Sequence, residues 1–364
     1  MTGVPARRAA GVALCLAMLA SGGTVLTACD AGKPAVTASA RATVSRAAGG
    51  GRIASRTVAG HRAASVAGEL PVPTALAPFG ASAGAGAGIW RPAGRDVDGV
   101  PAVYETTLVP PGGTQLAGIA WMDTALLSAR LYSGSKSPGG GPYRYTAPIL
   151  PAQAVSLVAA FNGGFKMADA HGGYYTEGRV IDPLAQGAAS LVIYASGRVT
   201  VGAWGTDVQM TPDVVAVRQN LVPLVADSRP TALAASADWQ AWGSTCGASS
   251  CAASVPGIEH QWRSGAGVTA DGALVYVVGP GLDPLQLAQL LARAGVVRGM
   301  QLDINPSWPA FASYAPATPH GLAAASNGSK LLAATKQGPW TFFEPWWARD
   351  FITMSARPGG PGTG

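Results

Sequence analysis

Charged residues, cysteine and long apolar runs are scarce in this chain of 364 residues. Asp, Glu, Lys and Arg make up only 12% of it, and it contains four cysteines. After the N-terminal segment no apolar stretch is long enough to span a membrane, so we expect an exported, soluble domain and not a protein with several transmembrane helices. No group of His, Cys and acidic residues has the spacing of metal ligands, so we expect neither a metal nor a cofactor.

The net charge of +6 belongs to the N-terminal quarter of the chain. Residues 1–86 hold eight basic and two acidic residues, whereas the remainder holds seventeen of each. The remainder is therefore neutral and offers no basic face for nucleic acid, which we exclude as a partner. The arginines of the N-terminal region suit contact with anionic lipid headgroups or an anionic wall polymer.

The N-terminus has the pattern of a lipoprotein signal peptide. Arg7 and Arg8 precede an apolar stretch over residues 9–20, and Ala28 is the small residue before a cleavage point. Cys29 would then be lipidated and hold the mature chain to the extracytoplasmic face of the cell membrane. An ordinary signal peptide with a chance cysteine and an uncleaved anchor helix are the alternatives.

Composition divides the remainder into a tether, one domain and a short tail. Residues 29–87 are almost entirely Ala, Gly, Ser, Thr, Val and Arg, which is typical of a disordered tether. Residues 88–358 have no internal linker and are expected to form one domain, followed by a disordered tail over residues 359–364. In an oxidising compartment Cys246 and Cys251 are expected to form a disulfide. A zinc site there lacks ligands, since the closest histidine is His260.

Frequent glycine and proline, 49 and 28 residues, favour a strand-rich and loop-rich fold. The expected elements are strands over Val103–Leu108, Leu116–Trp121, Leu126–Tyr132 and Asp350–Met354, and hairpins at Ser196-Gly197 and Asp271-Gly272. Asp283 is expected to cap a helix that begins at Pro284 and ends at Gly295, and a buried strand over Val296–Leu302 then delivers Asp303. This order predicts an α+β fold, with a single mixed, largely antiparallel sheet and few helices.

Four segments carry glycines and polar residues where an apolar strand stops. They are Ala160–Phe165, His171–Gly178, Glu259–Gly265 and Leu302–Pro306. Gly163 and Gly164 would let the backbone approach a ligand closely. Each segment alone is a weak signal, and their order along the chain is the specific one.

In that order the segments resemble the phosphodiester glycosidase family. The family's Asn-Gly-Gly-Phe turn corresponds to Asn162–Phe165, and its Gly-rich stretch to Gly172–Gly178. Its Arg before a Gly-Val-x-x-Asp-Gly hairpin corresponds to Arg263 and Gly267–Gly272, and its strand ending in Leu-Asp corresponds to Leu302-Asp303. The Leu-rich helix and the segment Arg218–Val225 also fit the family, so that the resemblance covers roughly residues 100–355. One departure is Ile304-Asn305, which stands where the family has two glycines and changes the geometry next to Asp303.

The resemblance implies hydrolysis of a sugar C1–O–P linkage through an oxocarbenium-like transition state. Asp303 is expected to act as the carboxylate at the anomeric carbon, and Glu177 as the acid. Arg263 would bind the phosphate. The expected substrate-binding groups also include Asn162, Gly163, Gly164, His171 and Asn305, with His260 as a further candidate for phosphate binding or proton transfer. Each has a structural alternative: Asp303 as a strand-end cap or a core carboxylate paired with Arg263, Glu177 as a solvated strand residue, and the histidines as loop residues.

The sequence thus predicts a lipid-anchored, monomeric hydrolase that cleaves a glycosyl phosphodiester or a related glycosidic bond in envelope polymers or glycoconjugates. A non-catalytic carbohydrate- or wall-binding module on the same fold is the first alternative, and Ile304-Asn305 favours it. A glycoside hydrolase acting on bonds without phosphate is the second, and a metal-dependent phosphodiesterase is a distant third.

Overall fold

The computed structural model describes residues 68–80, 84, 86–236, 238–243 and 259–357. The chain divides into two units, residues 1–62 and 63–364, and every described residue belongs to the second. The expected signal peptide, the lipidation site Cys29, the Cys246–Cys251 disulfide and the tail 359–364 lie outside the described residues. No helix within the described ranges has the length and apolar character that a membrane crossing requires.

Antiparallel strands dominate the described part of the chain, as the sequence predicts. One eight-stranded sheet has the order β1 (Arg91–Pro92), β4 (Val103–Leu108), β5 (Ala117–Met122), β16 (Leu274–Leu282), β15 (Gln261–Thr269), β17 (Val296–Gln301), β13 (Val225–Ala226), β14 (Arg229–Pro230). A second sheet has the order β11 (Val199–Ala203), β10 (Ala189–Tyr194), β12 (Val214–Gln219), β8 (Tyr174–Thr176), β9 (Arg179–Asp182). A third has the order β19 (Gly328–Lys330), β18 (Phe311–Tyr314), β7 (Leu157–Asn162), β20 (Phe351–Ala356), β6 (Leu127–Tyr132), and β2 (Asp96–Val97) pairs with β3 (Val100–Pro101).

Helices are few among the described residues, which confirms the α+β class. They are α1 (Pro151–Ala154), α2 (Met167–Ala170) and α3 (Pro284–Arg293), with 3-10 turns at Trp239–Trp242, Ala325–Asn327 and Pro339–Phe343. The sequence predicts one sheet, whereas the described strands form three sheets and a two-stranded ribbon. Strongly twisted strands seldom continue as one open sheet of this width, and separate sheets can share a core between them.

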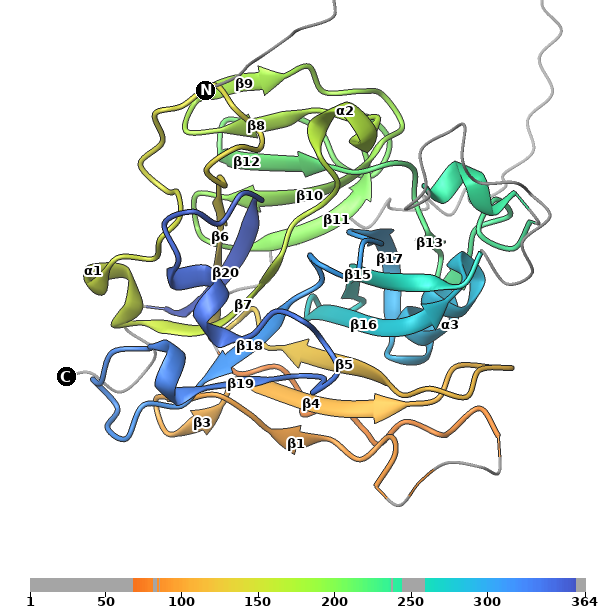
Figure 1. The fold of residues 1–364 in the computed structure, drawn as a ribbon, viewed down its shortest axis with the longest axis horizontal. Coiled ribbons are helices and arrows are strands. Elements are labelled where there is room, and N and C mark those ends of the chain that lie inside the picture. Colours follow the sequence, from red (N-terminus) through yellow and green to blue (C-terminus); the bar gives the residue numbers. More distant parts are fainter. Residues whose placement is uncertain (1–67, 81–83, 85, 237, 244–258, 358–364) are drawn as a thin grey trace, which may run out of the picture. The chain divides into compact units, whose positions relative to one another are not determined.

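The expected helix after Asp283 is confirmed. The Asp283 carboxylate accepts a hydrogen bond from the Gln286 N–H at 2.7 Å, and the Gln286 side chain accepts one from the Asp283 N–H at 3.0 Å. This capping box satisfies backbone donors that a helix start leaves free. α3 packs against the first sheet, beside β16 and β17 (Figure 1). Its residues Leu287 and Leu290 are fully buried.

One hydrophobic core joins the three larger sheets. It includes Met122 of β5, Val158 of β7, Leu191 of β10 and Met300 of β17. A second core lies under α3. The shared core fixes the strand ends of different sheets relative to one another, and these ends carry the polar residues described below.

The last part of the segment expected to be a tether contacts the domain. The Leu70 N–H donates a hydrogen bond to the Asp123 carboxylate at 2.8 Å, and Arg293 of α3 donates one to the Ala77 carbonyl at 2.7 Å. The part of the chain that packs on the domain therefore begins before residue 88.

Candidate functional site

Seven polar residues gather in the interior where strands of all three larger sheets end or begin. We call this set the buried polar cluster; its members are Asn162, Arg218, Asn220, Ser264, Asp303, Arg349 and Asp350. All are buried, and five of them flank strand ends: those of β7, β12 and β17 and the start of β20. Burying two carboxylates and two guanidinium groups together is costly unless they pair, so the cluster is a built feature and not a by-product of packing.

Strand register brings the members together. Phe351 of β20 is opposite Asn162 of β7, and the Gly163 N–H donates to the Asp350 carbonyl at 2.8 Å. On the first sheet, the Ser264 N–H donates to the Asp303 carbonyl at 2.8 Å. Residues about 190 positions apart in the chain thus meet because antiparallel pairing fixes which backbone groups face each other.

Asn162 lies at the centre of the hydrogen-bond network. Its side-chain oxygen accepts from the Tyr276 hydroxyl at 2.6 Å and from the Ala310 N–H at 3.1 Å. Its amide nitrogen donates to the Gly163 carbonyl at 2.7 Å and to the Ser264 hydroxyl at 3.1 Å. These four bonds use the whole capacity of the amide, so Asn162 holds the network together and has no bond left for a ligand in this arrangement.

The two residues after β7, Gly163 and Gly164, must be glycines because side chains of the cluster lie against their backbone. A side chain at Gly163 would collide with the Asp350 carboxylate, and a Cβ at Gly164 would lie 2.7 Å from the Asn220 side-chain oxygen. The sequence predicts close approach of a ligand at these glycines, whereas the described contacts are with protein groups of the cluster. The glycines make room for the cluster itself.

Asp303 and Arg349 form the more exposed of the two ion pairs in the cluster. The Arg349 guanidinium donates to the Asp303 carboxylate at 2.9 Å and to the Gly164 carbonyl at 2.8 Å. Side-chain exposure is 4% for Asp303 and 6% for Arg349. The Trp308 ring, which is partly exposed, lies 5.2 Å from the Arg349 guanidinium, so the pair borders the surface.

Burial raises the pKa of the Asp303 carboxyl from 3.8 to about 6. The Arg349 charge and the backbone N–H groups of Asn305 and Ile304 oppose the shift, because they stabilise the carboxylate. A carboxyl with a pKa near 6 can hold or release a proton close to neutral pH. This is the property that general acid–base catalysis needs.

Arg218 and Asp350 form a second, deeper ion pair. The Arg218 guanidinium donates to the Asp350 carboxylate at 2.7 Å, and neither side chain is exposed. Arg218 also donates to the carbonyls of Gln219 and Phe165. The pair therefore has its charges and most of its donors satisfied inside the protein, as a buried ion pair requires.

Arg263 lies on the other face of its strand from the cluster. Neighbouring residues of a strand point to opposite faces. Ser264 faces the cluster, to which it belongs, so Arg263 points away from it. Its guanidinium donates to Gln301, at 2.7 Å, and to the carbonyls of Leu282, Trp242 and Glu259. Burial lowers the pKa of Arg263 to about 10. The structure brings Arg263 to these protein acceptors and not to Asp303.

Glu177, His171 and His260 are exposed, unlike the members of the cluster. Glu177 is exposed in the turn between β8 and β9, with φ 51°, and its carboxylate accepts from the backbone N–H groups of residues 144 and 145. His171 is exposed in a left-handed conformation after α2. His260 lies 3.3 Å from the carboxylate of Glu259.

Ile304 and Asn305 form the turn that follows Asp303. Ile304 is buried in the core under α3, and Asn305 is partly exposed. The Asn305 N–H donates to the Asp303 carboxylate at 2.9 Å, and the Asn305 side chain accepts from the Ser307 N–H at 3.0 Å. Ile304-Asn305, the pair that stands where the family has two glycines, therefore helps to orient Asp303 through the hydrogen bonds of this turn.

Arg349 and Asp350 were missed by reasoning from sequence. The signal that was available is their position directly before an apolar strand, the same pattern that identified Asp303 after one.

Within the described residues no group of three or more His, Cys, Asp and Glu side chains is arranged to hold a metal ion.

Comparisons with known proteins give distant structural resemblance. No protein-family model matches the chain, and no curated protein matches it. Among solved structures, the catalytic domain of zebrafish N-acetylglucosamine-1-phosphodiester alpha-N-acetylglucosaminidase, auto-inhibited by its pro-peptide, is 15% identical with a TM-score of 0.42, over 74% of this chain and 88% of that chain. A hypothetical protein from Synechocystis is 12% identical with a TM-score of 0.35, over 73% of this chain and 64% of that chain. A protein of Burkholderia pseudomallei K96243 described as exported is 14% identical with a TM-score of 0.35, over 66% and 74%.

Proposed function

We propose that this protein is a hydrolase that cleaves a glycosyl phosphodiester or a related glycosidic bond, with Asp303 and Arg349 at the reaction centre. The observation that carries the proposal is the Asp303–Arg349 ion pair, in which a nearly buried carboxyl has a pKa of about 6 beside a fixed cation. The motif order in the sequence supplies the substrate class, since it resembles phosphodiester glycosidases.

The two partners supply different parts of the chemistry. A protonated Asp303 donates its proton to the leaving oxygen as the C1–O bond breaks, and the resulting carboxylate stabilises the positive charge that develops at the anomeric carbon. Water then adds to that carbon and returns a proton to Asp303. Arg349 binds a phosphate oxygen of the substrate through its guanidinium fork. We assign the cation to Arg349 in place of Arg263, because Arg263 is engaged by four protein oxygens.

Asp350 is the second carboxylate in place of Glu177. Arg218 pairs with Asp350 at 2.7 Å, so each of the two carboxyls of the cluster faces its own guanidinium group. Asn162, Gly163 and Gly164 keep these groups in register. Asn305 presents a partly exposed turn at the rim, where sugar hydroxyls would bind.

The test is release of free sugar from sugar-1-phosphodiesters by the full-length protein. Asp303→Asn keeps the shape of the side chain but cannot exchange a proton, and we expect sugar release to fall by about 10²-fold or more. Asp271→Asn, in an exposed hairpin turn, is the matched control and should keep full activity. Undiminished release by Asp303→Asn, with both variants folded by thermal melting, would overturn the proposal.

A non-catalytic carbohydrate-binding module is the second candidate. The near-complete burial of Asp303 and the Ile304-Asn305 turn favour it, because both restrict access to the carboxyl. Calorimetric binding of a sugar phosphodiester with no sugar release over days would select this alternative.

We further propose that Cys29 carries a lipid anchor, that the protein acts on the extracytoplasmic face of the membrane, and that it works as a monomer. The signal-like N-terminus and the neutral composition of the domain support this. Cys29→Ser should release the protein from the membrane fraction, and retention of the variant in that fraction would contradict the anchor.

A further inference from the structure

A cavity of about 760 Å³ lies away from the buried polar cluster. It runs along β6 and is bordered by residues near α1, by the turn after β8, and by the ends of β10 and β20. None of its lining residues belongs to the cluster. We call it the β6 cavity; its volume is in the range of small-molecule sites in proteins.

Two arginines of the β6 cavity stack on one aromatic ring. The Arg130 guanidinium lies 4.0 Å from the centre of the Tyr145 ring, and the Arg144 guanidinium lies 5.2 Å from it. Both arginines are exposed, and within the described ranges neither guanidinium has an acidic partner or a hydrogen-bond acceptor. Two like charges are thus held near one ring with their donors free for a ligand.

Glu177 fixes the backbone that carries one arginine and the ring. Its carboxylate accepts from the Arg144 N–H at 3.0 Å and from the Tyr145 N–H at 2.9 Å. Its negative charge is therefore directed at backbone donors. The third arginine of the lining, Arg357, donates to the carbonyls of Thr124 and Ser196. Three basic side chains and one acidic side chain line the cavity, so its excess charge is positive.

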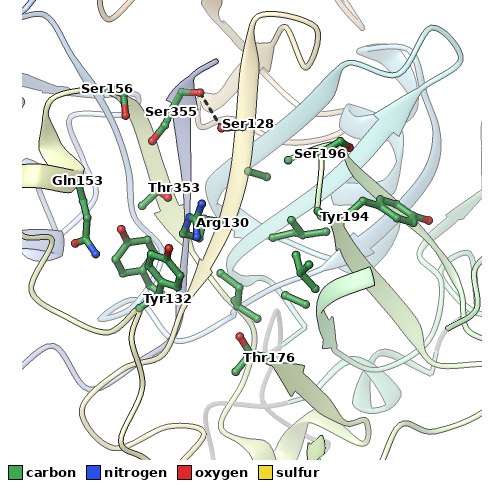
Figure 2. Close-up of a pocket in the computed structure, with 18 of the residues that line it drawn as sticks. Ser128, Arg130, Tyr132, Gln153, Ser156, Thr176, Tyr194, Ser196, Thr353 and Ser355 are labelled. Carbon is green, nitrogen blue, oxygen red and sulfur yellow. Dashed lines mark hydrogen bonds between the residues drawn. The ribbon is translucent and has the colours of Figure 1, made fainter. Parts of the chain in front are cut away.

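Uncharged polar groups lie on the same side of β6 as Arg130. Figure 2 shows Gln153, Thr353 and Tyr132 there, and Thr353 is the cross-strand partner of Arg130. The Gln153 side-chain oxygen accepts from the Leu150 N–H at 2.8 Å, which leaves its amide nitrogen to donate. Amide and hydroxyl groups beside paired guanidiniums match a ligand that combines hydroxyls with an anionic group.

We propose that the β6 cavity binds an anionic saccharide, with Arg130 and Arg144 on the anionic group and Gln153 on sugar hydroxyls. The site is separate from Asp303 and does not rest on the proposed hydrolysis. Tyr145 keeps the two guanidiniums in position, and Glu177 keeps Tyr145 in place.

The experiment is calorimetric titration of the full-length protein with glucose 1-phosphate, and with glucose and inorganic phosphate as the separate parts. The double variant Arg130→Gln with Arg144→Gln should bind glucose 1-phosphate at least tenfold more weakly than the wild type. Tyr145→Ala should do the same, whereas Tyr145→Phe retains the stacked ring and should bind within twofold of the wild type. Arg293→Gln is the matched control, because Arg293 also stacks on an aromatic ring, at 4.2 Å from Phe79, outside the cavity.

Asp303→Asn separates this site from the proposed reaction centre. We expect it to leave glucose 1-phosphate binding at the cavity unchanged, whether or not it abolishes sugar release. Equal binding by the double variant, or loss of binding in Asp303→Asn, would overturn the inference. Binding of inorganic phosphate or of glucose as tight as that of glucose 1-phosphate would overturn the ligand class. If the wild type releases no sugar but binds glucose 1-phosphate through Arg130 and Arg144, the result would count against the proposed function and not against the β6 cavity site.

Discussion

The buried polar cluster and the β6 cavity use arginine in opposite ways. In the cluster, Arg218 and Arg349 are each paired with a carboxylate, and their side chains are at most 6% exposed. In the cavity, Arg130 and Arg144 are exposed and stack on Tyr145, and neither is paired with an acidic side chain of the described residues. Desolvation explains the difference: a charge that leaves water needs an opposite charge, whereas a charge that keeps water can remain available for a ligand.

The comparison separates two kinds of contribution. The cluster's charges are paired inside the fold, so that changing one partner leaves the other buried and uncompensated. The cavity's charges contribute little to the fold, so that they can be changed with an effect on binding alone. The two regions should therefore respond differently to mutation, pH and salt.

Removing the deeper carboxylate should have the largest effect on stability. Asp350→Ala leaves Arg218 buried without its partner, and we expect the free energy of unfolding to fall by about 3–5 kcal/mol. Urea unfolding measures this, with Asp271→Asn as an exposed control expected to change it by less than about 0.5 kcal/mol. A loss below about 1 kcal/mol for Asp350→Ala would mean that water reaches Arg218.

The pH dependence of stability should reveal the raised pKa of Asp303. The Asp303 carboxyl has a pKa of about 6 in the folded protein and 3.8 as its ordinary value, so between these pH values only the folded protein keeps the proton. Protonation of Asp303 therefore stabilises the folded state below about pH 4, and this stabilisation is lost as the pH rises to about 6. The free energy of unfolding should fall by about 1–3 kcal/mol over that range. Unfolding of the wild type and of Asp303→Asn at several pH values measures it. A difference between the two that does not change with pH would contradict the raised pKa.

Salt should distinguish the two regions. Raising sodium chloride from about 50 mM to about 500 mM should weaken glucose 1-phosphate binding at the β6 cavity several-fold, because exposed charges are screened. The destabilisation caused by Asp350→Ala should change by less than about 0.5 kcal/mol over the same range, because buried pairs are screened much less. Cavity binding that is insensitive to salt would argue against guanidinium contacts.

The smallest effect is expected at the exposed carboxylate. Glu177→Ala frees two backbone N–H groups that water can reach, and the free energy of unfolding should fall by about 0.5–1 kcal/mol. The same urea experiment measures it. A loss as large as that of Asp350→Ala would show that Glu177 is not the solvated group that its exposure indicates.

Local patterns were sufficient to predict much of the fold. The capping residue Asp283 and the proline after it mark the start of α3, and the apolar run after the helix marks β17 with Asp303 beyond its end. Both features depend on residues close in the chain. The division into three sheets was not predicted, because it depends on which distant strands pair.

The candidate site could be predicted only in part for the same reason. Asp303 was chosen by its strand-end position, but its partner Arg349 comes from a segment 46 residues later and is brought there by β20. Arg263 and Ser264 are neighbours, and alternation requires that only one face the cluster. The sequence did not indicate that Ser264, and not Arg263, faces the cluster. A strand that is buried on both faces lacks the alternation of apolar and polar residues that would tell the two faces apart.

The place of β20 in its sheet has a consequence for how the chain matures. β20 is the last strand along the described chain, yet it lies between β7 and β6 and pairs with both. Until residues 349–356 have been synthesised and delivered, two strand edges remain open and Asp303 lacks its cation. Assembly of the proposed reaction centre is thus coupled to synthesis of residues 349–356, so that a product terminated before them would lack the Asp303–Arg349 pair and be prone to edge-to-edge association.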